Sequence, residues 1–213
     1  MKVSFLIPTR GRLQSLLGGI ESIKKTASPD VQIEILIRVD DNDTETLAGR
    51  SQIPSDVIVV VGPRWLGYDS GCLFFNELAA KSTGDWIIPW NDDIFMKTKH
   101  WDKLLPPFDN INIVWLHITG SWTWAHPIMT RKLYKLWGCF SPYSPCDACI
   151  FTIWRTAGKP LQESKDFKIT VEHHRNEADI IKRAIRPQDK VAPPRDPAIK
   201  TAGELAELLR NAK

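Results

Sequence analysis

The feature that most constrains the fold is an alternation of short apolar runs with helix-patterned segments in the first ninety residues. Four apolar runs have the length of buried strands, namely residues 3–7, 33–39, 57–61 and 86–90. Residues 13–25 carry apolar side chains at helical spacing, and residues 72–81 predict a second helix. Strands that alternate with helices predict an α/β fold, in which a mostly parallel central sheet has helices on both faces.

The second half of the chain is less regular. Further strands are predicted at 111–118 and 168–171, and helices at 130–137, 147–156 and 177–185. Residues 187–197 contain four prolines and predict a linker. The sequence Thr201-Ala202-Gly203-Glu204 then matches a capping box that opens a C-terminal helix. We therefore divide the chain into a domain of residues 1–186 and a linker with a helix over 187–213. That helix either docks on the core or leads to a further domain.

Composition excludes several classes of partner. A net charge of +3, with no dense basic run, gives no support for a nucleic-acid partner. No stretch approaches the roughly 18 apolar residues of a membrane span, and the apolar run at residues 3–7 is too short for a signal peptide. Four cysteines are too few for a disulfide scaffold, and Cys146 and Cys149 lack the second pair that a structural zinc site needs. A reducing, cytoplasmic location is the simplest expectation.

Polar residues follow three of the predicted strands. They are Thr9 and Arg10 after the first strand, Asp40 and Asp41 after the second, and Asn91, Asp92 and Asp93 after the fourth. In open α/β sheets ligands bind beyond the carboxyl ends of the strands, so we expect these groups to converge on one rim. Adjacent carboxylates repel each other and favour a divalent cation with oxygen ligands, such as one that also binds phosphate. The alternative is a solvated turn in which an Asp caps a helix.

The same segments resemble a known enzyme family. Residues 84–93, GDWIIPWNDD, resemble the part of GT-A glycosyltransferases, family 2 in particular, that ends in the DxD motif. Asn76, eight residues before Gly84, matches an Asn on the family's preceding helix. Residues 37–42, IRVDDN, and 3–10, VSFLIPTR, resemble its nucleotide-contacting strand ends. The resemblance implies the GT-A fold, a Rossmann-like nucleotide-diphospho-sugar transferase fold.

The resemblance also implies roles on the donor side. The donor would be contacted by Pro8, Thr9, Arg10, Asp40, Asp41, Asn76, Asp92 and Asp93. Within this set, Asp40 and Asp41 would contact the base and ribose, and Asp93 would hold Mn²⁺ or Mg²⁺ on the diphosphate. Asn91 stands where the first Asp of the motif is common, which is a departure from the family's pattern. A uridine diphosphate sugar is the favoured donor on the same grounds.

The acceptor side is matched less completely. Residues 131–158 resemble the stretch that contains the family's Glu-Asp motif, with Cys146 in place of the Glu. This implies that Asp147 is the general base, and a helix N-cap is the alternative role. A histidine after this segment completes the metal site in several GT-A enzymes. His173 or His174 would fill that place, but not both, because neighbours on a strand point in opposite directions. A pair of surface histidines is the alternative.

Aromatic residues supply the remaining candidates. Trp122, Trp124 and His126 are predicted acceptor contacts, although core packing explains tryptophans equally well. The predicted reaction is metal-dependent, inverting transfer of a hexose or deoxyhexose from a nucleoside-diphosphate sugar to a hydroxyl of a glycan or glycoprotein. Two alternatives are a sugar nucleotidyltransferase, for which residues 9–12 form a poor glycine-rich loop, and a non-catalytic carbohydrate-binding module. The size and motifs also resemble glycosyltransferase domains encoded by large algal viruses, which would imply glycan assembly on a coat protein.

Overall fold

The computed structural model describes residues 1–65, 71–118, 125–163, 169–174 and 200–212. Its strands are β1 (Lys2–Thr9), β2 (Gln32–Asp40), β3 (Ile58–Gly62), β4 (Trp86–Pro89), β5 (Ile94–Met96), β6 (Ile113–Ile118), β7 (Ala125–Thr130), β8 (Gln162–Glu163) and β9 (Thr170–His173). Its α-helices are α1 (Leu13–Thr26), α2 (Thr44–Ala48), α3 (Gly71–Lys81), α4 (Arg131–Trp137), α5 (Cys146–Thr156) and α8 (Ala202–Asn211), and 3₁₀ turns lie at Arg50–Gln52 and Trp101–Leu104. The predicted α/β class is confirmed.

The central sheet places the N-terminal strands next to one another. Its strand order is β3-β2-β1-β4-β7-β6-β9-β5, with β8 beside β6. β1 to β4 run parallel, whereas β7 is antiparallel to both β4 and β6. Leu6 of β1 lies opposite Leu36 of β2 and Pro89 of β4, so these three strands end at the same edge. The mostly parallel sheet is confirmed.

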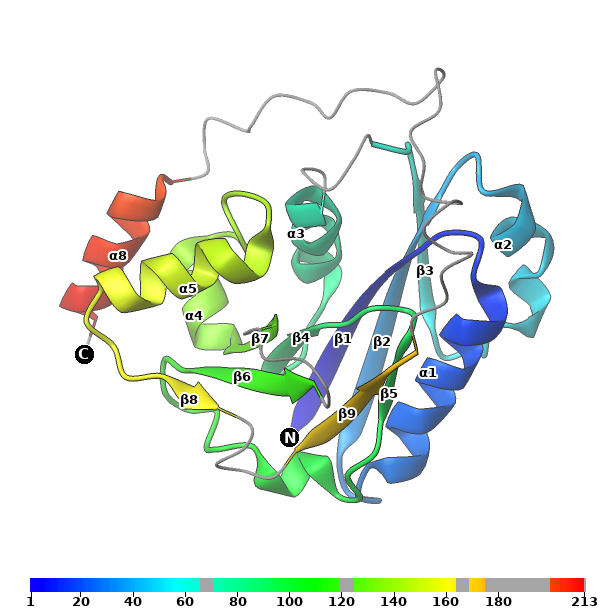
Figure 1. Cartoon of the computed structure of the whole chain (residues 1–213), viewed down its shortest axis with the longest axis horizontal. Helices are drawn as coiled ribbons and strands as arrows, with labels where there is room; N and C mark the ends of the chain where they lie inside the picture. The colour runs from blue at the N-terminus through cyan, green and yellow to red at the C-terminus, as the bar shows by residue number, and fades with distance from the viewer. Residues whose placement is uncertain (66–70, 119–124, 164–168, 175–199, 213) are drawn as a thin grey trace.

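Side chains alternate between two cores on the two faces of the sheet. Phe5 belongs to the core beneath α1, and Leu6 to the core beneath α3, α4, α5 and α8. α1 and α2 accordingly lie on one side of the strands, and the other helices lie on the opposite side (Figure 1). Helices on both faces bury the central strands β1 and β4, which are nearly continuous apolar runs, whereas β3 is partly exposed.

The sequence did not predict β5, β7, β8, α2 or the two 3₁₀ turns. β7 contains Pro127, and a proline within a run argues against a central strand. β5 has three residues and α2 has five, too few to show a periodic pattern. The predicted helix at 177–185 and the linker at 187–197 lie outside the described residues.

The C-terminal helix α8 begins where the capping box predicted. The Thr201 hydroxyl accepts a hydrogen bond from the N–H of Glu204, and the Glu204 carboxylate accepts one from the N–H of Thr201 at 2.6 Å. Leu205 and Leu209 are fully buried in the core shared with α4 and α5. The helix therefore docks on the core. Within the described part of the chain, no helix combines the length and apolar character that a membrane crossing requires.

Candidate active site

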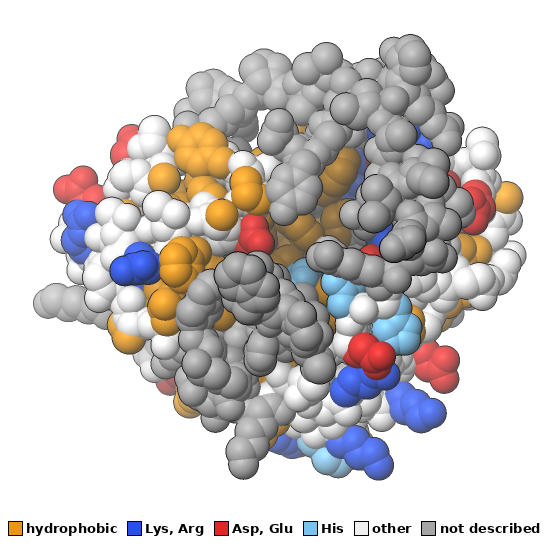
Figure 2. All heavy atoms as spheres, viewed as in Figure 1, with side chains coloured by type: hydrophobic (Ala, Val, Ile, Leu, Met, Phe, Trp, Pro, Cys, Tyr) orange, Lys and Arg blue, Asp and Glu red, His pale blue; other side chains and the backbone are white. Residues whose placement is uncertain are grey.

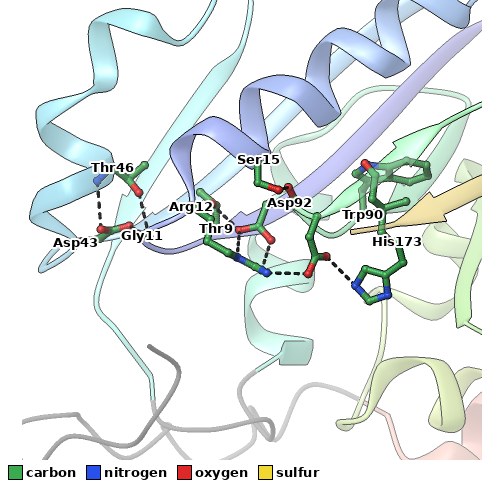
Figure 3. Close-up of polar contacts among 11 residues, drawn as sticks. Thr9, Gly11, Arg12, Ser15, Asp43, Thr46, Trp90, Asp92 and His173 are labelled. Atoms are coloured by element: carbon green, nitrogen blue, oxygen red, sulfur yellow. Dashed lines mark hydrogen bonds and ion pairs between the residues drawn. The ribbon is translucent and has the colours of Figure 1, made fainter. Parts of the chain in front are cut away.

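Side-chain hydrogen bonds join β1, α1 and the turn after β4 at the carboxyl edge of the sheet (Figure 3). The Thr9 hydroxyl donates to Asp92 Oδ2 at 2.8 Å. The Ser15 hydroxyl, in the first turn of α1, donates to the Asp92 carbonyl oxygen at 2.8 Å. Asp92 is 1% exposed. The structure thus brings the predicted strand ends together and holds one carboxylate of the acidic turn in a fixed position.

Arg12 is the cation of this cluster, and the sequence did not single it out. Its Nε donates to Asp92 Oδ2 at 3.1 Å, its Nη2 pairs with Asp92 Oδ1, and its Nη1 donates to Asp93 Oδ2 at 2.7 Å. Gly11 adopts a φ of +60°, which turns the chain from β1 into α1, and its N–H donates to Asp43 Oδ2 at 2.9 Å. The sequence did contain a signal for this role of Arg12: two adjacent buried carboxylates need a cation, and Arg12 follows the nearest strand end.

Asp93 lies between Arg12 and His173. His173 Nε2 is 3.1 Å from Asp93 Oδ1, and Asp93 is 4% exposed. Burial alone would raise the pKa of Asp93, but the hydrogen bond from His173 and the charge of Arg12 lower it to about 2. The carboxylate is therefore ionised at neutral pH.

The two neighbouring histidines point to different surroundings, as the strand geometry predicts. His174 stacks on Phe95 with ring centroids 4.3 Å apart, and its Nε2 is 3.1 Å from Glu172 Oε1. Its side chain is 48% exposed, against 17% for His173. The side chain of His173, and not that of His174, therefore points to the acidic turn.

The Asp93–His173 pair has the spacing of two metal ligands. Adjacent ligands of an octahedral ion, each about 2.1 Å from it, lie about 3.0 Å apart; the observed separation is 3.1 Å. Among the described residues, no group of three or more His, Cys, Asp or Glu side chains is arranged to hold a metal. Beyond the described residues, substrate oxygens and water are ligands that would complete the coordination of a metal at this pair.

A third carboxylate, that of Asp40 at the end of β2, is flanked by two arginines. Arg10 Nη1 donates to Asp40 Oδ2 at 3.0 Å, and Arg38 Nη1 pairs with Asp40 Oδ1. Arg38 is 1% exposed and also lies over the Phe74 ring, 4.4 Å from its centroid. Burial raises the pKa of Asp40, while the charges of Arg38 and Arg10 act against this shift. The result is a buried polar group at the edge next to the acidic turn.

The other predicted donor residues lie in different settings. Asp41 is exposed in the turn after β2, and Pro8 lies in β1 opposite Arg38. The Asn76 side chain binds backbone instead: Oδ1 accepts from the N–H of Phe140 at 2.7 Å, and Nδ2 donates to the Ser141 carbonyl at 2.8 Å. Asn76 therefore ties α3 to the segment after α4.

Asp147 lies on the opposite side of the sheet, in the first turn of α5. The helix begins at Cys146 and its N-cap is Pro145, so Asp147 is not the N-cap. Its Oδ1 accepts a hydrogen bond from the N–H of Ala148 at 2.9 Å, and its side chain is partly exposed. Burial raises the pKa of the neighbouring Cys146 thiol, which keeps that group protonated.

His126 is placed by a β-bulge. Trp115 pairs with Pro127 and Leu116 with Ala125, so His126 is the extra residue of β7, with a φ of +56°. Its ring lies 6.4 Å from the Trp90 ring, measured between centroids. Burial lowers the pKa of His126 to about 4, against the charge of Asp147, so the ring is neutral at neutral pH. Histidines gather near the middle of this face beside hydrophobic and acidic side chains (Figure 2). Trp122 and Trp124 lie outside the described residues.

Comparison with known proteins identifies the family. The sequence profile described as glycosyl transferase family 2 matches residues 4–141. The chain belongs to glycosyl transferase family 2. This membership decides against the nucleotidyltransferase and the carbohydrate-binding module. No protein of curated function matches the sequence.

Solved structures show the GT-A fold of this member of family 2. S. aureus TarS 1-349 in complex with UDP-GlcNAc matches with a TM-score of 0.60 and 13% identity over 83% of this chain and 60% of that one. The mannosyltransferase PcManGT from Pyrobaculum calidifontis, in complex with GDP-Man and Mn²⁺, matches with a TM-score of 0.60 and 13% identity over 98% of this chain and 68% of that one. The matched region spans 38% of the longer TarS chain.

Proposed function

We propose that this glycosyltransferase transfers a hexose or deoxyhexose from a nucleoside-diphosphate sugar to a hydroxyl of a glycan or glycoprotein, with inversion and with a divalent metal. The observation that carries the proposal is the pair formed by buried Asp93 and partly buried His173, spaced as two metal ligands at the carboxyl edge of the sheet. A uridine diphosphate donor is favoured by the resemblance of the strand ends. The TarS complex with UDP-GlcNAc and the PcManGT complex with GDP-Man and Mn²⁺ support a nucleotide-sugar donor whose base is uracil or guanine.

The donor would lie along the edge formed by β2, β1 and β4. Asp40, held by Arg10 and Arg38, offers a carboxylate to the base and ribose. Asp93 and His173 would hold Mn²⁺ or Mg²⁺ at the diphosphate. When bound, that ion would offset the negative charge of the departing diphosphate as a Lewis acid.

Asp147 would act on the acceptor. Its carboxylate takes the proton of the acceptor hydroxyl while the oxygen attacks the anomeric carbon of the sugar. The bond from that carbon to the diphosphate oxygen breaks, and its electron pair leaves with the nucleotide. Attack on the face opposite the leaving group inverts the anomeric centre. His126 would contact the acceptor as a neutral ring. It lies near enough to Asp147 for the charge of that carboxylate to affect its pKa.

A calorimetric titration with UDP and with GDP, each with and without Mn²⁺, tests the donor site. We expect Mn²⁺-dependent binding of at least one nucleotide. Asp93→Asn should lose the Mn²⁺-dependent part, because the substitution removes a charged ligand. Asp56→Asn is the matched control, because that exposed carboxylate pairs with Lys24 away from the site. If neither nucleotide binds in the presence of metal, the donor-site assignment is wrong.

A further inference from the structure

The acidic turn already holds a cation supplied by the chain itself. Arg12 meets Asp92 with two nitrogens and Asp93 with a third, and its side chain is 11% exposed (Figure 3). The loop before it is fixed by the left-handed Gly11 and by the hydrogen bond from Gly11 to Asp43. A positive charge thus lies where the sequence alone predicted that a metal ion would have to offset two carboxylates.

The two carboxylates differ in how they are held. Both oxygens of Asp92 bind Arg12, and Oδ2 also accepts from Thr9. Its side chain has no exposed surface. Asp93 binds Arg12 through Oδ2 and lies beside His173 through Oδ1, so its two oxygens face two different groups. Arg12 can therefore stay anchored on Asp92 whatever happens at Asp93.

Counting charges shows what Arg12 does to a metal at this site. The two carboxylates and one guanidinium leave one negative charge, provided that His173 binds metal as the neutral ring. A divalent ion alone would turn this into a net positive charge in a largely buried cluster, which is unfavourable. A diphosphate that arrives with the ion brings negative charge of its own and removes that penalty.

We propose that Arg12 is a built-in cation whose charge competes with that of a divalent metal beside Asp93, so that metal binds tightly only together with the nucleotide diphosphate. This inference rests on the metal site of the proposed function. It assigns Arg12 as a positioning residue that keeps the free enzyme from holding metal on its own. It also makes the diphosphate of the donor the group that recruits the ion.

The test measures binding of Mn²⁺ alone, without nucleotide, from the electron paramagnetic resonance signal of the free ion. We expect weak binding by the unmodified protein and binding about tenfold or more tighter by Arg12→Gln, because a nearby positive charge has been removed. Lys24→Gln is the matched control: it removes the same charge from an exposed ion pair with Asp56 and should leave Mn²⁺ affinity unchanged. Equal or weaker Mn²⁺ binding by Arg12→Gln would overturn the competition.

A second comparison remains decisive if Arg12→Gln fails to fold because the buried Asp92 loses its partner. Asp92→Asn should be compared with the double variant Arg12→Gln/Asp92→Asn, in which neither member of that ion pair remains. We expect the double variant to bind Mn²⁺ about tenfold more tightly than Asp92→Asn. No difference between them would contradict the proposal. Nucleotide binding by the unmodified protein is a separate measurement, so its failure would overturn the proposed function and would be distinguishable from this result.

Discussion

The two sides of the proposed active site, a donor side and an acceptor side, are built in different ways. On the donor side, three parallel strands end in register, and their polar side chains bind one another: Thr9 with Asp92, and Arg10 with Asp40. On the acceptor side, the strands are antiparallel, and a bulge displaces one residue, His126, into the left-handed region. Asp147 is placed there by a helix start and not by a strand end.

The difference indicates what each side has to recognise. Parallel strands that end together deliver carboxylates and arginines to one rim through backbone geometry alone, which suits a donor part common to many enzymes. A bulge re-aims a single side chain, and such local departures suit recognition of one particular acceptor. We therefore expect substitutions on the two sides to separate into effects on donor binding and effects on the chemical step or acceptor binding.

The largest effect is expected for Asp147→Asn. Removing a general base should lower kcat by a factor of about 10² to 10⁴ and leave the Kd for the nucleotide unchanged. The free energy of unfolding should change by less than about 0.5 kcal/mol, since Asp147 is partly exposed and is not the N-cap. Steady-state kinetics, nucleotide calorimetry and denaturant unfolding on one preparation check all three. If Asp147→Asn lost nucleotide affinity, the effects on the donor side and the acceptor side would not be separable as we expect.

His126 allows its ring and its backbone to be tested apart. Glycine adopts a φ of +56° freely, so His126→Gly keeps the bulge and removes the ring, whereas His126→Ala removes the ring and keeps the strain. We expect both variants to raise the KM for the acceptor about tenfold, the equivalent of one hydrogen bond. The alanine variant should be less stable than the glycine variant by about 1 kcal/mol, because alanine is strained at a positive φ. A normal acceptor KM in His126→Gly would mean that the ring makes no acceptor contact.

The sequence predicted the donor half of the fold well because its signals are local. Apolar runs of strand length marked β1, β2, β3 and β4 to within one or two residues at each end. The convergence of their ends follows from parallel strand order and needs no knowledge of side-chain contacts.

The remaining features depend on contacts between distant segments. β7 becomes a central strand despite Pro127 because β4 and β6 pair with it on either side. The side-chain amide of Asn76 is used by the backbone of Phe140 and Ser141, more than sixty residues away. Arg12 has its role because Asp92 and Asp93 approach it from β4. Sequence spacing alone contains none of these pairings.

The smallest effect on activity is expected at the opposite end of the same parallel strands. Glu34 of β2 is buried, and its carboxylate accepts hydrogen bonds from Ser4 at 2.6 Å and from the Thr83 N–H at 2.7 Å, and pairs with Lys2. Glu34→Gln should destabilise the protein by about 1–3 kcal/mol and leave nucleotide affinity unchanged. Asp30→Asn is the control, because its ion pair with Lys103 is exposed and should contribute little.

The pH dependence of unfolding sharpens this last prediction. Burial alone would raise the pKa of Glu34, but the hydrogen bonds from Lys2, Ser4 and Thr83 lower it from 4.5 to about 2. A carboxyl group whose pKa is lower in the folded state stabilises the protein above its unfolded pKa. That contribution should be complete above about pH 4.5 and be lost as the pH falls toward 2. In denaturant unfolding, the difference between the unmodified protein and Glu34→Gln should therefore shrink over this interval. A difference that stays constant with pH would show that the cluster acts through packing and not through the charge of Glu34.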